Sequence, residues 1–107
     1  MTTTAKYSLS IDSVAVGTTV ADSDAISYGD FEKGMVSVPA GSSVSTLTWH
    51  ASSSEGGTYL AANNASGAIT QTVSASKVYP IPTDLQGARF LKITGNAAGV
   101  VGVTLKD

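Results

Sequence analysis

The stretch Val44-Ser-Thr-Leu-Thr-Trp-His-Ala51 decides the fold class of this chain. Apolar and polar side chains alternate along it with a period of two, which is the period of a β-strand that buries one face. One face is predicted to carry Leu47, Trp49 and Ala51, and the other Thr46, Thr48 and His50. Because Trp49 shares its phase with two aliphatic residues, we expect it to lie in a core between sheets.

The same alternation recurs near the beginning of the chain. Tyr7, Leu9 and Ile11 share one phase, and Val14 and Val16 take the opposite phase. Such a change inside one strand is typical of a β-bulge, which we expect near residues 12–13. Further strands are predicted at 35–38, 58–61 and 69–75, with turns at Pro39-Ala40-Gly41 and around Asn63, Asn64 and Gly67.

Toward the end of the chain, Pro80 and Pro82 flank Ile81 and favour an edge segment, because proline donates nothing to a sheet ladder. A final pair of strands is predicted on either side of the glycine-bounded loop 95–99. Leu91 and Ile93 precede this loop, and Val101, Val103 and Leu105 follow it. We predict that these two strands form a hairpin.

The pattern as a whole predicts an all-β fold. About seven or eight short strands with regularly spaced turns are typical of an antiparallel β-sandwich or jelly roll. Residues 1–107 are long enough for one domain, with 1–5 expected to be flexible. Residues 21–33 lack a clear period and are predicted to form a long connection, held down by Ile26, Tyr28 and Phe31.

The composition argues against several classes of function. Charged residues make up only 13% of the chain and the net charge is −2, with the cations scattered at Lys6, Lys33, Lys77, Arg89, Lys92 and Lys106. A nucleic-acid surface needs clustered cations, so we expect no nucleic-acid partner. No cysteine is present, which excludes disulfides and thiolate metal sites. We expect no signal peptide and no membrane span, and therefore a protein made in a cytoplasm.

Candidate catalytic residues are few. His50 is the only histidine, and its nearest acid in sequence, Glu55, lies in the following loop. A general base needs a partner within hydrogen-bond reach, so we interpret His50 as a half-exposed strand residue and predict that the protein is not an enzyme. Asp22, Asp24, Asp30 and Glu32 are the alternative set, either as ligands of a hard cation or as a glycosidase pair. A solvated acidic loop is the simpler interpretation, and we expect no metal and no cofactor.

Aromatic side chains suggest a second kind of function. Exposed on a sheet face, Trp49, Tyr59 and Tyr79 would stack on sugar rings, as in carbohydrate-binding sandwiches. The alternation pattern, in which Trp49 shares its phase with Leu47 and Ala51, favours burial of these aromatic side chains instead. Phe90 is out of phase with Leu91 and Ile93, so it is expected to face a partner subunit or a second edge of the core.

Two stretches carry a family resemblance. Residues 38–52, followed by Gly56-Gly-Thr-Tyr59, resemble small β-sandwich proteins that tailed bacteriophages encode near their capsid genes. The resemblance extends through Val78-Tyr-Pro-Ile-Pro82 and residues 87–93 to Val101-Gly-Val-Thr-Leu-Lys106. It covers residues 34–106, whereas residues 1–33 have no counterpart and would be the place for a capsid-gripping arm.

The resemblance implies a virion structural protein, and specifically a capsid decoration (cement) protein on the outside of the phage head. Its implied partners are the major capsid protein and further copies of itself, with a trimer favoured. It implies assembly in the host cytoplasm and no catalytic residues. A carbohydrate-binding module used for adhesion is the alternative, and a hydrolase built on His50 or the acids of residues 22–32 is a third hypothesis.

Overall fold

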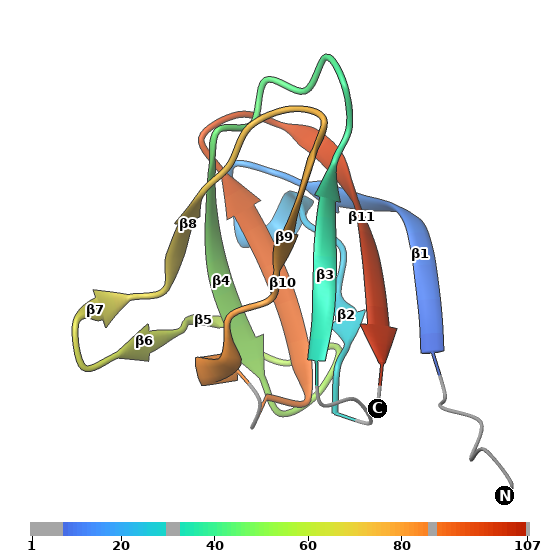
Figure 1. Ribbon diagram of the computed structural model, residues 1–107. Coiled ribbons are helices and arrows are strands. Elements are labelled where there is room, and N and C mark those ends of the chain that lie inside the picture. The colour runs from blue at the N-terminus through green and yellow to red at the C-terminus, as the bar shows by residue number, and fades with distance from the viewer. Residues whose placement is uncertain (1–7, 30–32, 86–87, 107) are drawn as a thin grey trace, which may run out of the picture.

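The computed structural model describes residues 8–29, 33–85 and 88–106. Over these residues the chain forms two antiparallel β-sheets that pack face to face, with a small projecting hairpin at one side (Figure 1). The predicted all-β sandwich is therefore confirmed. The described residues contain no α-helix, only two 3₁₀ turns, η1 (Val20–Asp22) and η2 (Thr83–Leu85), and none is long and apolar enough to cross a membrane.

The first sheet has four strands in the order β1-β11-β3-β9. These are β1 (Ser8–Val16), β11 (Gly99–Lys106), β3 (Lys33–Val38) and β9 (Lys77–Pro80). The register of β1 against β11 shifts between Ile11 and Val14, which confirms the predicted bulge. The edge position of β9 confirms the prediction drawn from its proline.

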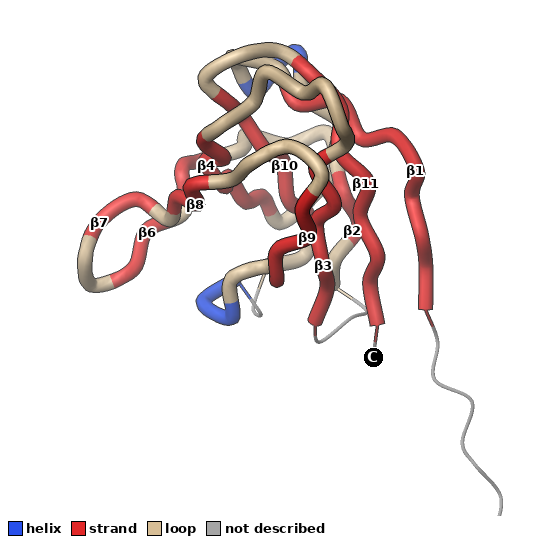
Figure 2. Tube along the Cα trace, turned by 45° about the horizontal axis from the view of Figure 1, so that its top comes forward, coloured by secondary structure: helices blue, strands red, loops and turns tan. Residues whose placement is uncertain are grey.

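The second sheet is built around β4 (Thr46–Ser52) and β10 (Phe90–Gly95). Its order is β2-β10-β4-β5, with β2 at Ile26–Ser27 and β5 at Leu60–Ala61, and β8 (Thr70–Thr72) pairs with another part of β4. The predicted strands at 58–61 and 69–75 are thus shorter than expected. The predicted turn at Asn63, Asn64 and Gly67 is a two-stranded hairpin of β6 (Asn63–Asn64) and β7 (Gly67–Ala68), which projects from the body (Figure 2).

The core fills the space between the two sheets. Leu47, Trp49, Leu91 and Ile93 contribute from the second sheet and have no exposed surface. Val36, Val101, Val103 and Leu105 meet them from the first sheet and are at most 2% exposed. The predicted burial of Trp49 with Leu47 is therefore confirmed, and Ala51 packs partly buried against the same cluster.

The predicted hairpin at the end of the chain is wrong. β10 pairs with β4 and β2, whereas β11 pairs with β1 and β3, so residues 96–98 carry the chain from one sheet to the other. Alternation specifies which side chains face the core but not which strand lies alongside, so it fits a crossing as well as a hairpin. The crossing is tight, because a Cβ on Gly95 would lie 3.1 Å from side-chain atoms of Val16 and Val44.

The connection predicted at 21–33 is partly a sheet element. Ile26 and Tyr28 are buried, as predicted, with exposed fractions of 0% and 1%. The prediction of a long connection without a strand is wrong at β2, which pairs with β10 at Leu91. Phe31 and the predicted flexible residues 1–5 lie outside the described residues.

Candidate functional site

His50 lies on the outer face of the second sheet, opposite in phase to Trp49, as predicted. Its Nε2 is 2.9 Å from the Thr94 hydroxyl on the neighbouring strand β10. Burial lowers the pKa of this imidazole, which favours its neutral form. Lys92 is the residue directly opposite it in register, and its ammonium donates to the Val20 carbonyl at 3.2 Å. The hydrogen-bond partner of the imidazole is thus a threonine hydroxyl, not a carboxylate.

The acidic loop closes the free edge of β1. The Ala15 N–H donates to Asp24 Oδ2 at 2.9 Å, and the Asp24 N–H donates to the Ala15 carbonyl at 3.0 Å. The Asp22 carboxylate accepts a 3.3 Å hydrogen bond from the Thr19 hydroxyl, and the Asp22 N–H donates to the Thr19 carbonyl at 3.2 Å. These contacts cover backbone groups that an edge strand would leave unpaired. Asp30 and Glu32 lie outside the described residues, and no three metal-ligating side chains gather within the described ranges.

The aromatic residues that the structure describes do not form a sugar-stacking platform. Trp49 has no exposed surface, and its indole N–H donates to Gln71 Oε1 at 2.9 Å. Tyr59 is buried with its hydroxyl on the Glu55 carbonyl, and half-buried Tyr79 accepts a hydrogen bond from the Ser74 N–H. Phe90 is half-buried on the outer face of the second sheet. The carbohydrate-binding alternative therefore loses the surface on which it depends.

A different surface stands out, namely the solvent-facing side of the first sheet, which we call the apolar face. Of the four large hydrophobic side chains exposed among the described residues, three lie on it: Met35 (41% exposed), Val78 (55%) and Val100 (44%). The other described outward residues are small or hydroxyl-bearing, apart from the two lysines at one end; they are Ser10, Ala15, Ser37, Pro80, Gly102 and Thr104. Sheet faces exposed to water normally carry polar and charged residues, so this composition makes the apolar face the candidate interaction surface.

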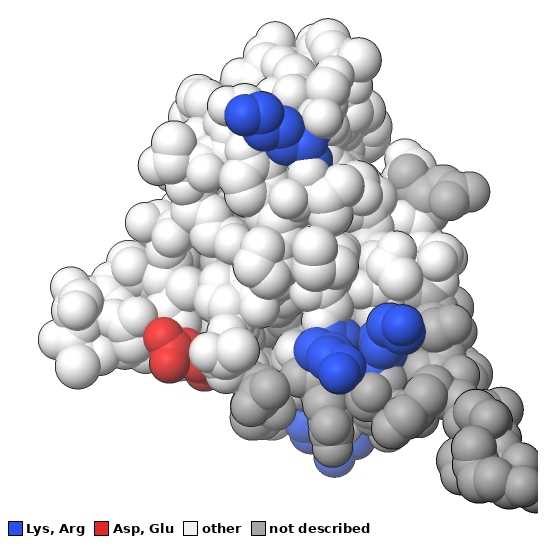
Figure 3. All heavy atoms as spheres, viewed as in Figure 1, with Lys and Arg blue, Asp and Glu red and all other residues white. Residues whose placement is uncertain are grey.

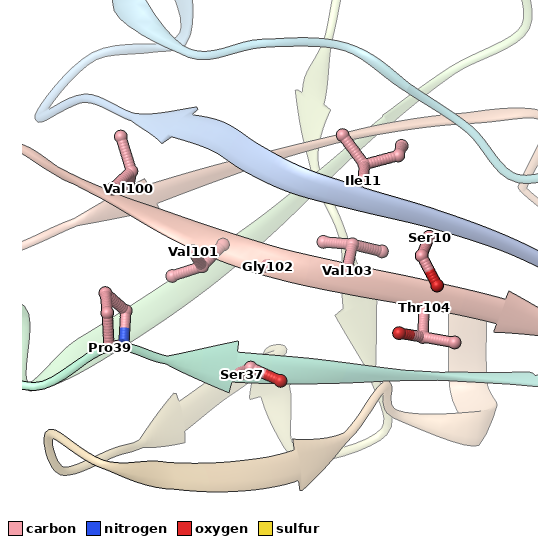
Figure 4. Close-up of a pocket in the computed structure, with 9 residues that line it drawn as sticks. All are labelled: Ser10, Ile11, Ser37, Pro39, Val100, Val101, Gly102, Val103 and Thr104. Carbon is pink, nitrogen blue, oxygen red and sulfur yellow. The ribbon is translucent and has the colours of Figure 1, made fainter.

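Two shallow hollows interrupt the apolar face. The first lies over Gly102, which sits between the outward residues Val100 and Thr104 on β11 (Figure 4). Because glycine has no side chain, the surface is hollowed there. Ser37 borders it from β3 and Ser10 from β1 (Figure 4). The second, of about 330 Å³, has Met35, Pro80 and Ile81 among its lining residues and is almost entirely apolar. Both hollows are open surface depressions, suited to receive side chains from a facing protein surface.

Charge on the apolar face lies at one end. Lys33 and Lys106 are both exposed and are directly opposite each other in the register of β3 and β11. Lys77 is exposed at the other end of the sheet, but it is opposite buried Val38 and therefore in the phase that faces the core. Figure 3 views this side and shows blue side chains toward two ends of a white surface. In the described part of the chain, no carboxylate lies within ion-pair distance of these three lysines.

Comparison with family models, with curated proteins and with solved structures found no match. The apolar face was not predicted from the sequence, although part of its signal is there. Val100 is out of phase with Val101 and Val103, and Met35 with Val36 and Val38, so both were readable as outward-facing. That they share a face with Val78 depends on the strand order β11-β3-β9, which alternation does not contain.

Proposed function

We propose that this protein is a non-catalytic structural component of a phage virion. Its specific role would be capsid decoration, in which it binds the outside of the head through contact with the major capsid protein and stabilises the shell. We further propose that it acts as a homo-oligomer, with three copies favoured. The observation that carries this proposal is the apolar face, because it offers a flat, weakly charged surface to another protein.

The area of the apolar face fits a partner that presents many identical binding sites. Its outward residues span about 20 Å along β11 and about 19 Å across four strands, or roughly 400 Å². A stable one-to-one complex buries about 800 Å² on each partner. A single copy is therefore expected to bind weakly, whereas linked copies on a repetitive shell gain from effective concentration. Decoration of a lattice places this modest demand on each interface.

The test is co-sedimentation with undecorated heads. Heads assembled from the major capsid protein of the same phage are mixed with the purified full chain, pelleted and assayed for bound protein. We expect saturable binding and a higher temperature of head disruption. The native mass of the free protein, measured by sedimentation, should correspond to an oligomer. Absence of the protein from the pellet over a wide concentration range would refute the proposal.

A further inference from the structure

We propose that the apolar face docks on a protein surface that presents carboxylates opposite Lys33 and Lys106 and a small-residue or apolar strip opposite Met35 and Val78. This inference rests on the proposed function and adds to it the docking surface, the chemistry of the partner and the orientation. The Lys33–Lys106 end would meet the acidic part of the partner.

The first argument is that the two lysines repel each other in the free protein. They are a direct cross-strand pair on the same face of a sheet, an arrangement in which like charges destabilise the sheet. Neither is paired with a described carboxylate. A partner carboxylate placed between the two ammonium groups would remove this repulsion and form two ion pairs at once. The pair therefore stabilises a complex with an acidic surface more than it stabilises the free chain.

The second argument concerns a second copy of the same face as the occupant. If two apolar faces packed together with their strands in the same direction, Lys33 and Lys106 would meet their own copies. In the opposite direction they would meet the Val100 end of the facing copy, and none of the described side chains on the face is acidic. Neither arrangement supplies carboxylates to the lysine pair, so a different surface that carries carboxylates is the better occupant.

The third argument concerns the kind of acidic partner. A nucleic acid is bound by several clustered cations, and here only two lysines stand together. Beside them lie the exposed side chain of Met35 and a hollow that Pro80 and Ile81 line together with the two lysines, and its mostly apolar lining offers little to a phosphate backbone. An apolar centre with charges at its edge is instead the usual anatomy of a protein–protein interface. The occupant is therefore a protein surface.

The decisive variant is Lys33→Glu, because docking and folding should respond in opposite directions. In the free protein it replaces a like-charge pair by a Glu–Lys pair, so the melting temperature should stay equal or rise. On undecorated heads it places a carboxylate against carboxylates, so the affinity should fall at least tenfold. Arg89→Glu makes the same change of charge at an exposed residue that precedes β10 of the other sheet, and it should bind as the wild type does.

A second pair of variants tests the centre of the apolar face without using the lysines. Ser37→Glu places a charge in the middle of the face, and Thr70→Glu places one on exposed strand β8 of the other sheet. Only Ser37→Glu should weaken binding to heads. Raising the salt concentration from 0.05 to 0.5 M should weaken wild-type binding, because added salt shortens the screening length of exposed charges to below about 10 Å. The residual binding of Lys33→Glu should change little, because the attraction that salt screens is already lost.

The outcomes separate this inference from the proposed function. If the wild type does not bind heads, both are wrong. If the wild type binds and Lys33→Glu or Ser37→Glu binds equally well, only the docking surface is wrong. A change in the native mass of Lys33→Glu would show that the apolar face joins copies of this chain, and retention on DNA that is lost in Lys33→Glu would point to a polyanion. Either of these results also overturns the inference.

Discussion

Gln71 is expected to be one of the most sensitive polar positions, because it ties the two sheets together. It lies on β8 of the second sheet, accepts from the Trp49 indole at 2.9 Å, and donates to the Pro80 carbonyl on β9 of the first sheet at 2.7 Å. Gln71→Met keeps the size and removes both bonds. A buried indole N–H without a partner costs about 1–3 kcal/mol, and loss of the more exposed bond to Pro80 about 0.5–1 kcal/mol. We expect a loss of about 2–4 kcal/mol in the free energy of unfolding, or roughly 10–20 °C in melting temperature.

The assay is urea unfolding followed by the fluorescence of Trp49, the only tryptophan. A double-mutant cycle with Trp49→Phe isolates the indole bond, because phenylalanine has no N–H to leave unpaired. In the Trp49→Phe background, followed by circular dichroism, Gln71→Met should cost at least 1 kcal/mol less than it does alone. A cost below about 0.5 kcal/mol in the wild-type background, or no coupling between the two sites, would refute the reasoning.

Three further predictions concern stability. Gly34→Ala should lower the free energy of unfolding by about 1–3 kcal/mol, because a Cβ there would lie 2.7–2.8 Å from three neighbouring atoms. Gly56→Ala is the control, because Gly56 has open space around it and the urea midpoint should change little. Equal effects of the two substitutions would contradict the packing around Gly34. Burial lowers the pKa of His50 in the folded protein, so on acidification the unfolded chain binds a proton before the folded protein does. The urea midpoint should therefore decrease as the pH is lowered from about 7.5 to about 5.5. His50→Gln should flatten that dependence, and an unchanged slope would show that another group titrates. Asp24→Ala should lose about 1 kcal/mol and speed amide exchange at Ala15, its hydrogen-bond donor, and unchanged exchange there would contradict the edge-closing role.

The fold class was predictable because burial dictates a period of two. Leu47 and Trp49 identify the core strand, the phase change between Ile11 and Val14 identifies the bulge, and Pro80 identifies an edge. The hairpin predicted around residues 95–99 failed for a physical reason. A hairpin and a crossing between sheets bury the same alternate residues, so only long-range pairing with β1 and β3 distinguishes them.

The candidate site was less predictable than the fold. Sequence reasoning concentrated on residues with reactive side chains, such as His50 and Asp24, and the structure gives both of them local hydrogen-bonding partners. The apolar face contains no such residues, and its members are ordinary ones whose meaning comes from their neighbours. Met35 and Val100 are 65 positions apart in the sequence and reach the same face only because β3 pairs with β11.

The position of β11 has a consequence for biosynthesis. It is the last strand described and the one between β1 and β3, so Ser8 finds its neighbour only at Lys106. During translation β1 and β3 are therefore made before the strand that lies between them, and their backbone edges are open to wrong pairing until β11 has been synthesised. Premature termination before residue 99 would remove the middle of this sheet, and the truncated product should be a substrate for chaperones or proteases.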